Sequence, residues 1–230
     1  MKMREHILDD IPVCFHTDDV KKRLRIKPGS AMERDFEQLA ETARNLAAPR
    51  AYYRIEGIDA KGEETVTIGG VTLTSRVLSV NLSALNRVFP YVATCGPEIE
   101  EWSHGIDDVL MRFWADAFNS SALYAAIQAL RADVGRRFAP GRLSSMTPGS
   151  LKDWPLREQK QLFKLLGETV SSTGVVLTDG YMMKPAKSVS GVLFANDEGY
   201  ENCELCPRKN CPGRRKSYSP GLCEKKYANI

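Results

Sequence analysis

The chain has 230 residues, of which 43% are hydrophobic and 27% charged, proportions that are ordinary for a globular protein able to bury a core. No apolar run approaches the roughly 20 residues that cross a bilayer, so the sequence predicts no membrane-spanning helix. The formal net charge of +3 is concentrated in residues 201–230, which hold seven Lys or Arg and three Asp or Glu, leaving 25 basic and 26 acidic residues in 1–200. A nucleic-acid binder that spreads basic charge over a whole face is therefore disfavoured.

The N-terminal part of the chain contains one clear helix signal. Ser30-Ala-Met-Glu33 is a capping box, in which the Ser30 hydroxyl accepts from the backbone N–H three residues on and the Glu33 side chain reaches back to the Ser30 N–H. Apolar residues then recur at helical spacing until Pro49 ends the pattern. Residues 51–58 have the composition of a strand. Two short apolar segments, residues 66–68 and 71–73, flank Gly69-Gly70 at the spacing of a tight hairpin.

The middle of the chain predicts a short strand and then a long helical region. Residues 91–94 form the strand, residue 98 begins a helical stretch, and residues 107–137 form one long helix or two abutting ones. One side of this helix is expected to carry apolar and small residues that pack closely in the core: Leu110, Phe113, Trp114, Ala117, Ser121 and Tyr124.

The remaining elements complete a mixed pattern. Residues 138–154, rich in Gly, Pro and Ser, are expected to form an irregular excursion between helices, and such loops are often functional. Residues 156–166 are helical by spacing, and residues 175–177 and 189–194 are expected as strands. Because helices and strands do not alternate as parallel βαβ units do, the sequence predicts an α+β fold with a mostly antiparallel sheet and packed helices.

Four of the six cysteines lie within twenty-one residues, in the pattern C-x2-C-x4-C-x11-C: Cys203, Cys206, Cys211 and Cys223. The opening residues lack the apolar core of a secretory signal, so a cytoplasmic location with reduced thiols is expected. The cluster then favours a metal site over disulfides, and nearby basic residues would offset the charge of four thiolates. We therefore predict a domain of residues 1–200 and a small cysteine-rich, basic, metal-binding appendage of residues 201–230.

The identity of the metal is open at this point. Four thiolates suit tetrahedral zinc and an iron-sulfur cluster alike. A redox role would favour a [4Fe-4S] cluster, whereas a closed structural knuckle that fixes the tail would favour zinc. The other two cysteines, Cys14 and Cys95, lie in apolar surroundings and are expected to be buried thiols rather than ligands.

One stretch has an order that composition and periodicity do not explain, Thr178-Asp-Gly-Tyr-Met-Met-Lys-Pro-Ala-Lys-Ser-Val-Ser-Gly-Val-Leu-Phe194. Together with Pro148-Gly149 and Asp153-Trp-Pro-Leu-Arg-Glu-Gln-Lys-Gln-Leu-Phe163, it resembles the activation (reactivation) domain of cobalamin-dependent methionine synthase and its stand-alone relatives. The resemblance is closest over residues 137–194. It implies the α+β fold of that domain, in agreement with the pattern of predicted elements.

The resemblance also implies a function. Domains of this family bind S-adenosylmethionine and present its methyl group to cobalamin, so that cob(II)alamin formed by oxidation is reduced by one electron and remethylated. Since positioning of the donor would be the main contribution of the protein, no catalytic residue is assigned. The chain has no Asp-x-His-x-x-Gly motif that would ligate cobalamin, so the cofactor would be supplied by a separate corrinoid protein or methyltransferase. The donor cavity would open beside residues 184–191, and a separate electron donor would be a further partner.

The family pattern, an arginine shortly before a Pro-Gly pair with an aromatic residue after it, fits this chain in two registers. One uses Arg137-Phe-Ala-Pro-Gly141 and puts Arg142 where tyrosine is expected. The other uses Thr147-Pro-Gly149, agrees better with the residues downstream, and puts Ser145 where arginine is expected. The resemblance thus implies these candidate cofactor-binding residues: Arg137, Arg142, Pro148, Gly149, Tyr181, Ser188, Ser190 and Tyr200.

Three functions follow from these observations. The first is a stand-alone reactivation factor that binds S-adenosylmethionine and supports reductive methylation of cob(II)alamin on another protein. The second is a non-enzymatic module that binds a corrinoid protein and carries a structural metal tail, a reading favoured by the absent arginine of the second register. The third, nucleic-acid binding through the basic tail, is disfavoured because only Tyr218 and Tyr227 interleave its charges.

Overall fold

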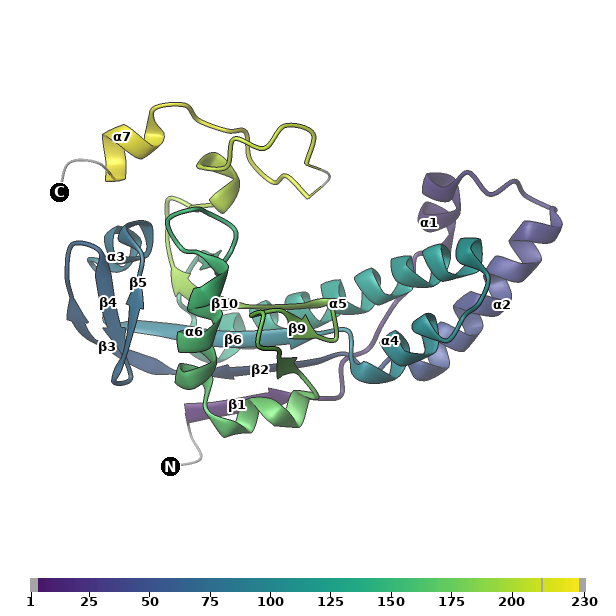
Figure 1. Ribbon diagram of the computed structural model, residues 1–230, viewed down its shortest axis with the longest axis horizontal. Helices are drawn as coiled ribbons and strands as arrows, with labels where there is room; N and C mark the ends of the chain where they lie inside the picture. Colours follow the sequence, from purple (N-terminus) through teal and green to yellow (C-terminus); the bar gives the residue numbers. More distant parts are fainter. Residues whose placement is uncertain (1–3, 212, 228–230) are drawn as a thin grey trace.

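A sheet of eight strands, all paired antiparallel, organises the chain (Figure 1). The computed structural model describes residues 4–211 and 213–227, apart from the side chains of Arg23 and Cys223. The central strand of the sheet is β6 (Arg87–Thr94), which is longer than the predicted strand of residues 91–94. One edge of β6 pairs with β2 (Arg50–Arg54) and β3 (Glu56–Lys61), and the other edge pairs with β10 (Ser188–Ala195).

The outer strands extend this centre on both sides. β1 (Glu5–Leu8) pairs with β2, and β7 (Leu143–Met146) pairs with β10. β4 (Thr65–Ile68) and β5 (Val71–Thr74) form the predicted hairpin beside β3, and both of its turn residues, Gly69 and Gly70, have positive φ (54° and 76°). A tight turn of this kind needs positive φ at both central positions, which explains the glycine pair.

The predicted helix after Ser30 is confirmed as α2 (Ala31–Leu46), which ends ahead of Pro49. The Ser30 hydroxyl accepts from the Glu33 N–H at 3.2 Å, as a capping residue should. The reciprocal half of the predicted capping box is wrong, because the Glu33 carboxylate accepts from the N–H of Gly29 at 2.6 Å. The Ser30 N–H instead donates to the Lys27 carbonyl at 3.3 Å.

The long helical region forms a single helix of 30 residues, α5 (Val109–Phe138). Its C-terminal half covers one face of the sheet, where its apolar residues pack against those of β6 and β10. Its N-terminal half extends beyond the sheet and packs against α2, α4 (Pro97–His104) and α1 (Thr17–Leu24) (Figure 1). The predicted apolar side is therefore only partly right: Trp114 is buried, whereas Leu110, Phe113 and Tyr124 are 46%, 61% and 63% exposed.

The opposite face of the sheet is covered by α6 (Gln159–Leu166) and α3 (Arg76–Leu82). Short 3-10 turns precede and follow α6, at Leu156–Glu158 and Glu168–Thr173. A small separate hairpin joins β8 (Val176–Leu177) to β9 (Met183–Lys184). Within the segment 138–154, expected to be irregular, β7 is a strand, because its backbone pairs with β10 although its own residues carry no strand pattern.

The C-terminal tail, defined here as residues 201–227, lies against the sheet domain and contains a 3-10 turn, Asn202–Glu204, and α7 (Leu222–Tyr227). Leu205, Leu222 and Tyr227 pack against the same core cluster as the residues beneath α6. The predicted α+β fold with an antiparallel sheet is thus confirmed. No helix in the described ranges has the length and apolar content required to traverse a bilayer.

The two cysteines outside the tail differ from each other. Cys95 is fully buried at the end of β6, and burial raises the pKa of its thiol to about 12, as expected for an inert core residue. The expectation that Cys14 is buried is wrong. Cys14 is exposed and borders a cavity of about 680 Å³ between the N-terminal segment and α5, because the chain between β1 and α1 runs over the surface of that helix.

Candidate functional site

The Pro148-Gly149 pair of the preferred register forms a tight turn at the end of β7. The Gly149 N–H donates to the Trp154 carbonyl at 2.7 Å, and the Ser150 N–H donates to the Thr147 carbonyl at 3.2 Å. Gly149 has a φ of +84°, and a Cβ added there would lie 3.0 Å from Cδ1 of Leu156. The turn therefore requires glycine both for its backbone conformation and for its close packing.

The residues after this turn fix it to the domain. Trp154 is fully buried, and its indole N–H has no hydrogen-bond partner among the described residues. The Asp153 carboxylate accepts from the backbone N–H groups of Arg76 and Val77 at 3.2 and 3.1 Å and from the Ser75 hydroxyl, at the N-terminus of α3. A carboxylate in this position is stabilised by the free N–H groups of the first helical turn. Asp153 and Trp154 thus hold the Pro-Gly turn in place rather than facing a ligand.

A cavity of about 850 Å³ lies between residues 149–156 and the tail. Figure 1 shows the tail passing over the loop that precedes α6, which brings these two distant parts of the sequence together. The domain side of the cavity is formed by Val77, Gly149, Ser150, Leu151, Lys152, Asp153, Pro155 and Leu156. The tail side is formed by Leu205, Cys206, Pro207, Arg208 and Tyr218. The expected cavity beside residues 184–191 is not this one, because no residue of that range lines it.

Two predicted arginines make their contacts away from the Pro-Gly turn. Arg137, in the last turn of α5, donates from Nε to the Asp133 carboxylate at 2.8 Å. Asp133 is buried and also accepts from the Tyr53 hydroxyl at 2.7 Å. Burial alone would raise the pKa of Asp133, but the hydrogen bonds from Tyr53, Arg137 and Arg136 outweigh it and hold that pKa below its ordinary value. Arg142 lies at the opposite end of β7 from Pro148, with its guanidinium against Gly199.

The candidate residues on the signature stretch are mostly engaged within the protein. Ser190 is buried and its hydroxyl donates to Oε1 of Gln159 at 2.5 Å. The Ser188 hydroxyl lies 2.8 Å from the Thr94 hydroxyl and 2.7 Å from the Pro185 carbonyl. Tyr181 differs from both, since it is 36% exposed and has a φ of +62° in the loop between β8 and β9. Of these three residues, Tyr181 is exposed, Ser188 is half-buried and Ser190 is buried.

Tyr200 lies beneath the tail, near acidic residues of the sheet domain and of the tail. It is 4% exposed, and its hydroxyl has no hydrogen-bond partner within the described ranges. Burial raises the pKa of Tyr200 above its ordinary value, and the nearby acidic residues Asp153, Glu204 and Glu201 raise it further. Tyr200 is therefore a neutral phenol in a site that is both closed and acidic.

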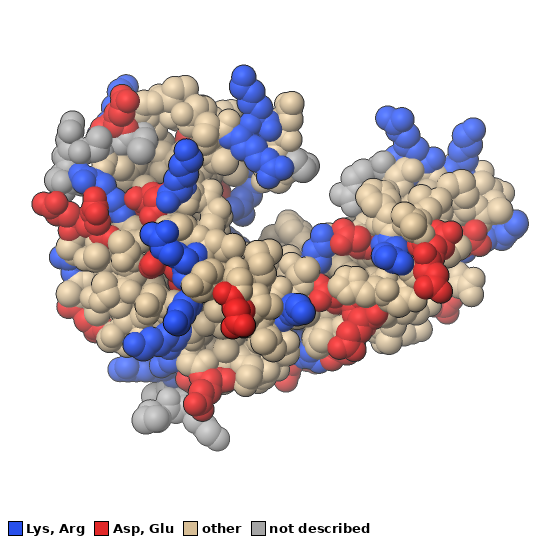
Figure 2. Space-filling model, in the orientation of Figure 1, with Lys and Arg blue, Asp and Glu red and all other residues tan. Residues whose placement is uncertain are grey.

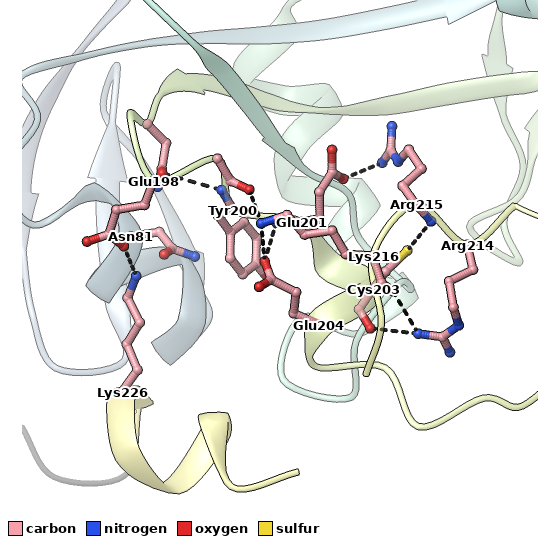
Figure 3. A network of polar contacts seen from close by, with 12 residues as sticks. Asn81, Glu198, Tyr200, Glu201, Cys203, Glu204, Arg214, Arg215, Lys216 and Lys226 are labelled. Carbon is pink, nitrogen blue, oxygen red and sulfur yellow. Dashed lines mark hydrogen bonds and ion pairs between the residues drawn. The ribbon is translucent and has the colours of Figure 1, made fainter. Parts of the chain in front are cut away.

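The tail is organised by one arginine that sequence reasoning treated only as a source of charge. Arg214 donates to four backbone carbonyls of the tail, those of Cys203 and Cys206 at 2.9 and 3.1 Å, of Lys216 at 3.2 Å, and of Arg208. Figure 3 shows this guanidinium directed at the carbonyl of Cys203, while the backbone N–H of Arg215 donates to the Cys203 sulfur at 3.4 Å. No spacing in the sequence signals this role, because the acceptors are main-chain groups.

A hydrogen bond from Lys216 and an ion pair of Lys226 attach the tail to the sheet domain. Lys216 donates to the Gly199 carbonyl of the domain at 2.6 Å and, within the tail, pairs with Glu204 at 3.1 Å (Figure 3). Lys226 of α7 pairs with Glu198 at 2.8 Å. Figure 2 shows Lys and Arg side chains over this part of the surface, and a hollow between it and the end of the molecule formed by α1 and α2.

The predicted metal ligands are only partly within the described structure. Cys203, Cys206 and Cys211 are half-buried free thiols, and the side chain of Cys223 lies outside the description. Among the residues whose side chains are described, no three His, Cys, Asp or Glu are gathered as a metal ion requires. The described residues alone therefore do not make a metal site, and the four-cysteine site stays a prediction.

Comparison with known proteins bears on the region of the Pro-Gly turn. Residues 137–205 match the family described as vitamin B12 dependent methionine synthase, activation domain. The resemblance to that activation domain is confirmed. A crystal structure of the MetH reactivation domain bound to AdoHcy superposes with a TM-score of 0.66 over 86% of this chain and 80% of that chain, at 14% identity. No curated protein matches the chain.

The activation-domain match contains most of the candidate site. Its range, residues 137–205, includes the Pro-Gly turn, Asp153, Trp154 and Tyr200, and it ends at the first tail residue that lines the cavity, Leu205. The structural similarity shows the activation-domain fold, and extends it to the N-terminal part of the chain, where the sequence resemblance is weak. The greater part of the tail, including three of the four cysteines of its pattern, lies beyond the family match.

Proposed function

We propose that this chain is a reactivation factor that binds S-adenosylmethionine and supports reductive methylation of cob(II)alamin carried by a separate corrinoid protein. The observation that carries the proposal is the family match over residues 137–205, which contains the Pro-Gly turn beside the cavity. The similar reactivation domain was crystallised with AdoHcy, the compound that S-adenosylmethionine becomes after it gives up its methyl group.

The contribution of the protein would be to hold the donor rather than to move protons. The backbone of residues 147–150 is held by two backbone hydrogen bonds, and Asp153 and Trp154 anchor it. The N–H groups of Gly149 and Ser150 are engaged within the protein, so the turn would offer a nucleoside backbone carbonyl groups, already held in one conformation. The sulfonium already carries a reactive methyl group, so correct orientation toward the acceptor provides much of the rate increase. The bound corrinoid would supply the metal that accepts the methyl group.

The cysteine tail and the location belong to the same proposal. A zinc ion or an iron-sulfur cluster on Cys203, Cys206, Cys211 and Cys223 would make residues 201–230 a separate metal-binding unit beside domain 1–200. A cytoplasmic location would keep these thiols reduced. Zinc would hold the tail in shape, whereas a cluster would suit transfer of the single electron that reactivation needs from a separate donor.

The direct test is a remethylation assay with a corrinoid methyltransferase that has been converted to its cob(II)alamin form. The chain, a one-electron reductant and S-adenosylmethionine labelled in its methyl group are added, and the absorption spectrum and the label on the corrinoid are followed. We expect conversion to methylcobalamin only when all three are present. Gly149→Ala should slow this conversion because its backbone and Leu156 both oppose a Cβ, whereas Gly135→Ala, where no atom lies within 4 Å, should not.

A second candidate function is a binding module without methyl transfer. It is favoured by the engaged state of the candidate residues, since Arg137 bonds Asp133 and Ser190 bonds Gln159. Under this alternative the chain would form a stable complex with the cob(II)alamin protein, measured by size-exclusion chromatography, and would transfer no label to it. That result would rule out methyl transfer by this chain and would support binding to a corrinoid protein.

A further inference from the structure

The cavity beside the Pro-Gly turn has two walls of different origin. One wall belongs, apart from Val77, to the region of the activation-domain match, and the other is formed almost wholly by tail residues beyond it. The tail wall is held in shape by Arg214, whose guanidinium binds the carbonyls of Cys206 and Arg208 within that wall. The cavity is thus a built feature of the tail and the domain together, with a volume of about 850 Å³. Pockets for small molecules fall in the same range.

Most of the cavity surface is apolar. From the domain side it is lined by Val77, Leu151, Pro155 and Leu156, and from the tail side by Leu205, Pro207 and Tyr218. Tyr218 lines the cavity and is 44% exposed, so part of this aromatic side chain is accessible to a ligand. Such walls, one with an aromatic ring and one with branched aliphatic side chains, suit a planar ring system between them.

Two cations border this apolar surface, one on each wall. Lys152 and Arg208 are both exposed, and neither forms an ion pair with any side chain that the structure describes. The acidic residue of the lining, Asp153, directs its carboxylate to the N-terminus of α3, where it accepts from Ser75 and two backbone N–H groups. The cavity therefore offers positive charge without an acidic side chain that satisfies it.

We propose that this cavity binds a small molecule in which a planar ring system is joined to one anionic group. The ring lies between Leu156 and Tyr218, and the anionic group is held by Lys152 and Arg208. The tail is then a wall of a ligand site and not only an appendage. The inference shares the cavity beside the Pro-Gly turn with the proposed function and assigns a binding role to tail residues outside the family match. It requires neither a corrinoid nor methyl transfer, so its test and the remethylation assay can fail independently.

The test uses two dyes that differ only in the anionic group. 1-Anilinonaphthalene-8-sulfonate carries a sulfonate on its rings, and N-phenyl-1-naphthylamine has the same rings without it. Both are titrated by fluorescence into the full chain. Exposed apolar residues elsewhere, such as Phe113, attract the rings of both dyes equally, so the readout is the ratio of their dissociation constants. We expect the sulfonate to bind about tenfold more tightly.

Matched variants locate the effect. Lys152→Ala and Arg208→Ala should each reduce the tenfold preference about threefold, and the double variant should abolish it. Arg208→Lys should retain the preference. Lys160→Ala and Lys209→Ala remove exposed cations that do not line the cavity and should leave it unchanged. Equal affinity of the two dyes for the unaltered chain, or a preference that survives the double variant, would overturn the inference. Circular dichroism checks that each variant is folded.

Discussion

The sheet domain and the C-terminal tail are held together by different forces. In the sheet, Met146, Val192 and Phe194 bring β7 and β10 into an apolar core in which each is at most 1% exposed. In the tail, Arg214 binds backbone carbonyls and two ion pairs join tail residues to one another, while the pair of Lys226 with Glu198 and a few apolar side chains attach the segment to the domain. Stabilisation by buried apolar side chains depends on how well the side chains fit together, whereas stabilisation by charged hydrogen bonds is lost when a single donor is removed. The tail should therefore open independently of the sheet, and variants in each region can test this contrast.

The largest effect is expected at Trp154, the largest fully buried side chain of the core. Trp154→Ala would leave a cavity beneath the Pro-Gly turn and should lower the free energy of unfolding by about 3–5 kcal/mol in urea denaturation. The matched control is Phe113→Ala on α5, where the side chain is 61% exposed and the change should be within about 0.5 kcal/mol. A small effect at Trp154 would show that the loop is not part of the core.

A second variant tests the close approach of β10 to β7. At Gly191 a Cβ would lie 2.3 Å from the Met146 carbonyl oxygen and 2.9 Å from Cγ2 of Thr147. Gly191→Ala should therefore destabilise the protein by about 1–3 kcal/mol, since the strands must move apart. Gly135→Ala in α5 meets no atom within 4 Å and should instead stabilise by about 0.4–1 kcal/mol. Thermal unfolding of the two variants gives the comparison, and equal shifts would contradict the packing described here.

The tail should respond to loss of its central donor without a comparable effect on the sheet. Arg214→Ala leaves four carbonyls without their shared partner, which should lower the local opening free energy of the tail by about 1–2 kcal/mol. Hydrogen exchange should then speed up over the tail and stay unchanged in β6 and β10. Lys209→Ala, an exposed neighbour, is the control. Faster exchange throughout the sheet would mean that the two regions unfold as one.

The smallest effect concerns the ion pair between Lys226 and Glu198 at the surface. The hydrogen bond from Lys226 lowers the pKa of Glu198, so the pair stabilises tail docking above the ordinary carboxylate pKa and loses this effect as the pH falls through the lowered value. In Lys226→Ala the pKa of Glu198 should rise toward its ordinary value, as followed by carbon NMR of the carboxylate. Lys225→Ala should leave the pKa of Glu198 unchanged. An equal shift in that variant would show that the pKa responds to the net charge of α7 and not to the ion pair with Lys226.

The same contrast explains what could be predicted from the sequence. The helix after Ser30 and the hairpin at Gly69-Gly70 depend on local signals, and both are confirmed. β7 was missed because Leu-Ser-Ser-Met carries no strand pattern, and its pairing with β10 comes from a segment far along the chain. The exposed side of α5 was missed because periodicity does not show where a helix extends beyond its sheet.

For the candidate site, the family resemblance identified the Pro-Gly turn, and the structure shows it as a hydrogen-bonded turn beside a cavity. The second wall of that cavity could not be predicted. It depends on Arg214 folding the tail through main-chain carbonyls, which leave no residue pattern. Lys152 and Arg208 lie far apart in the sequence and line one cavity only because the tail passes over the loop.

The most direct test of the account is calorimetric titration of S-adenosylmethionine into the purified chain, with S-adenosylhomocysteine as a second ligand. The account predicts saturable binding of both compounds, weakened in Gly149→Ala and unchanged in Gly135→Ala. Absence of binding heat for either compound at millimolar concentration, with a chain shown to be folded, would contradict the claim that this activation-domain fold holds the methyl donor.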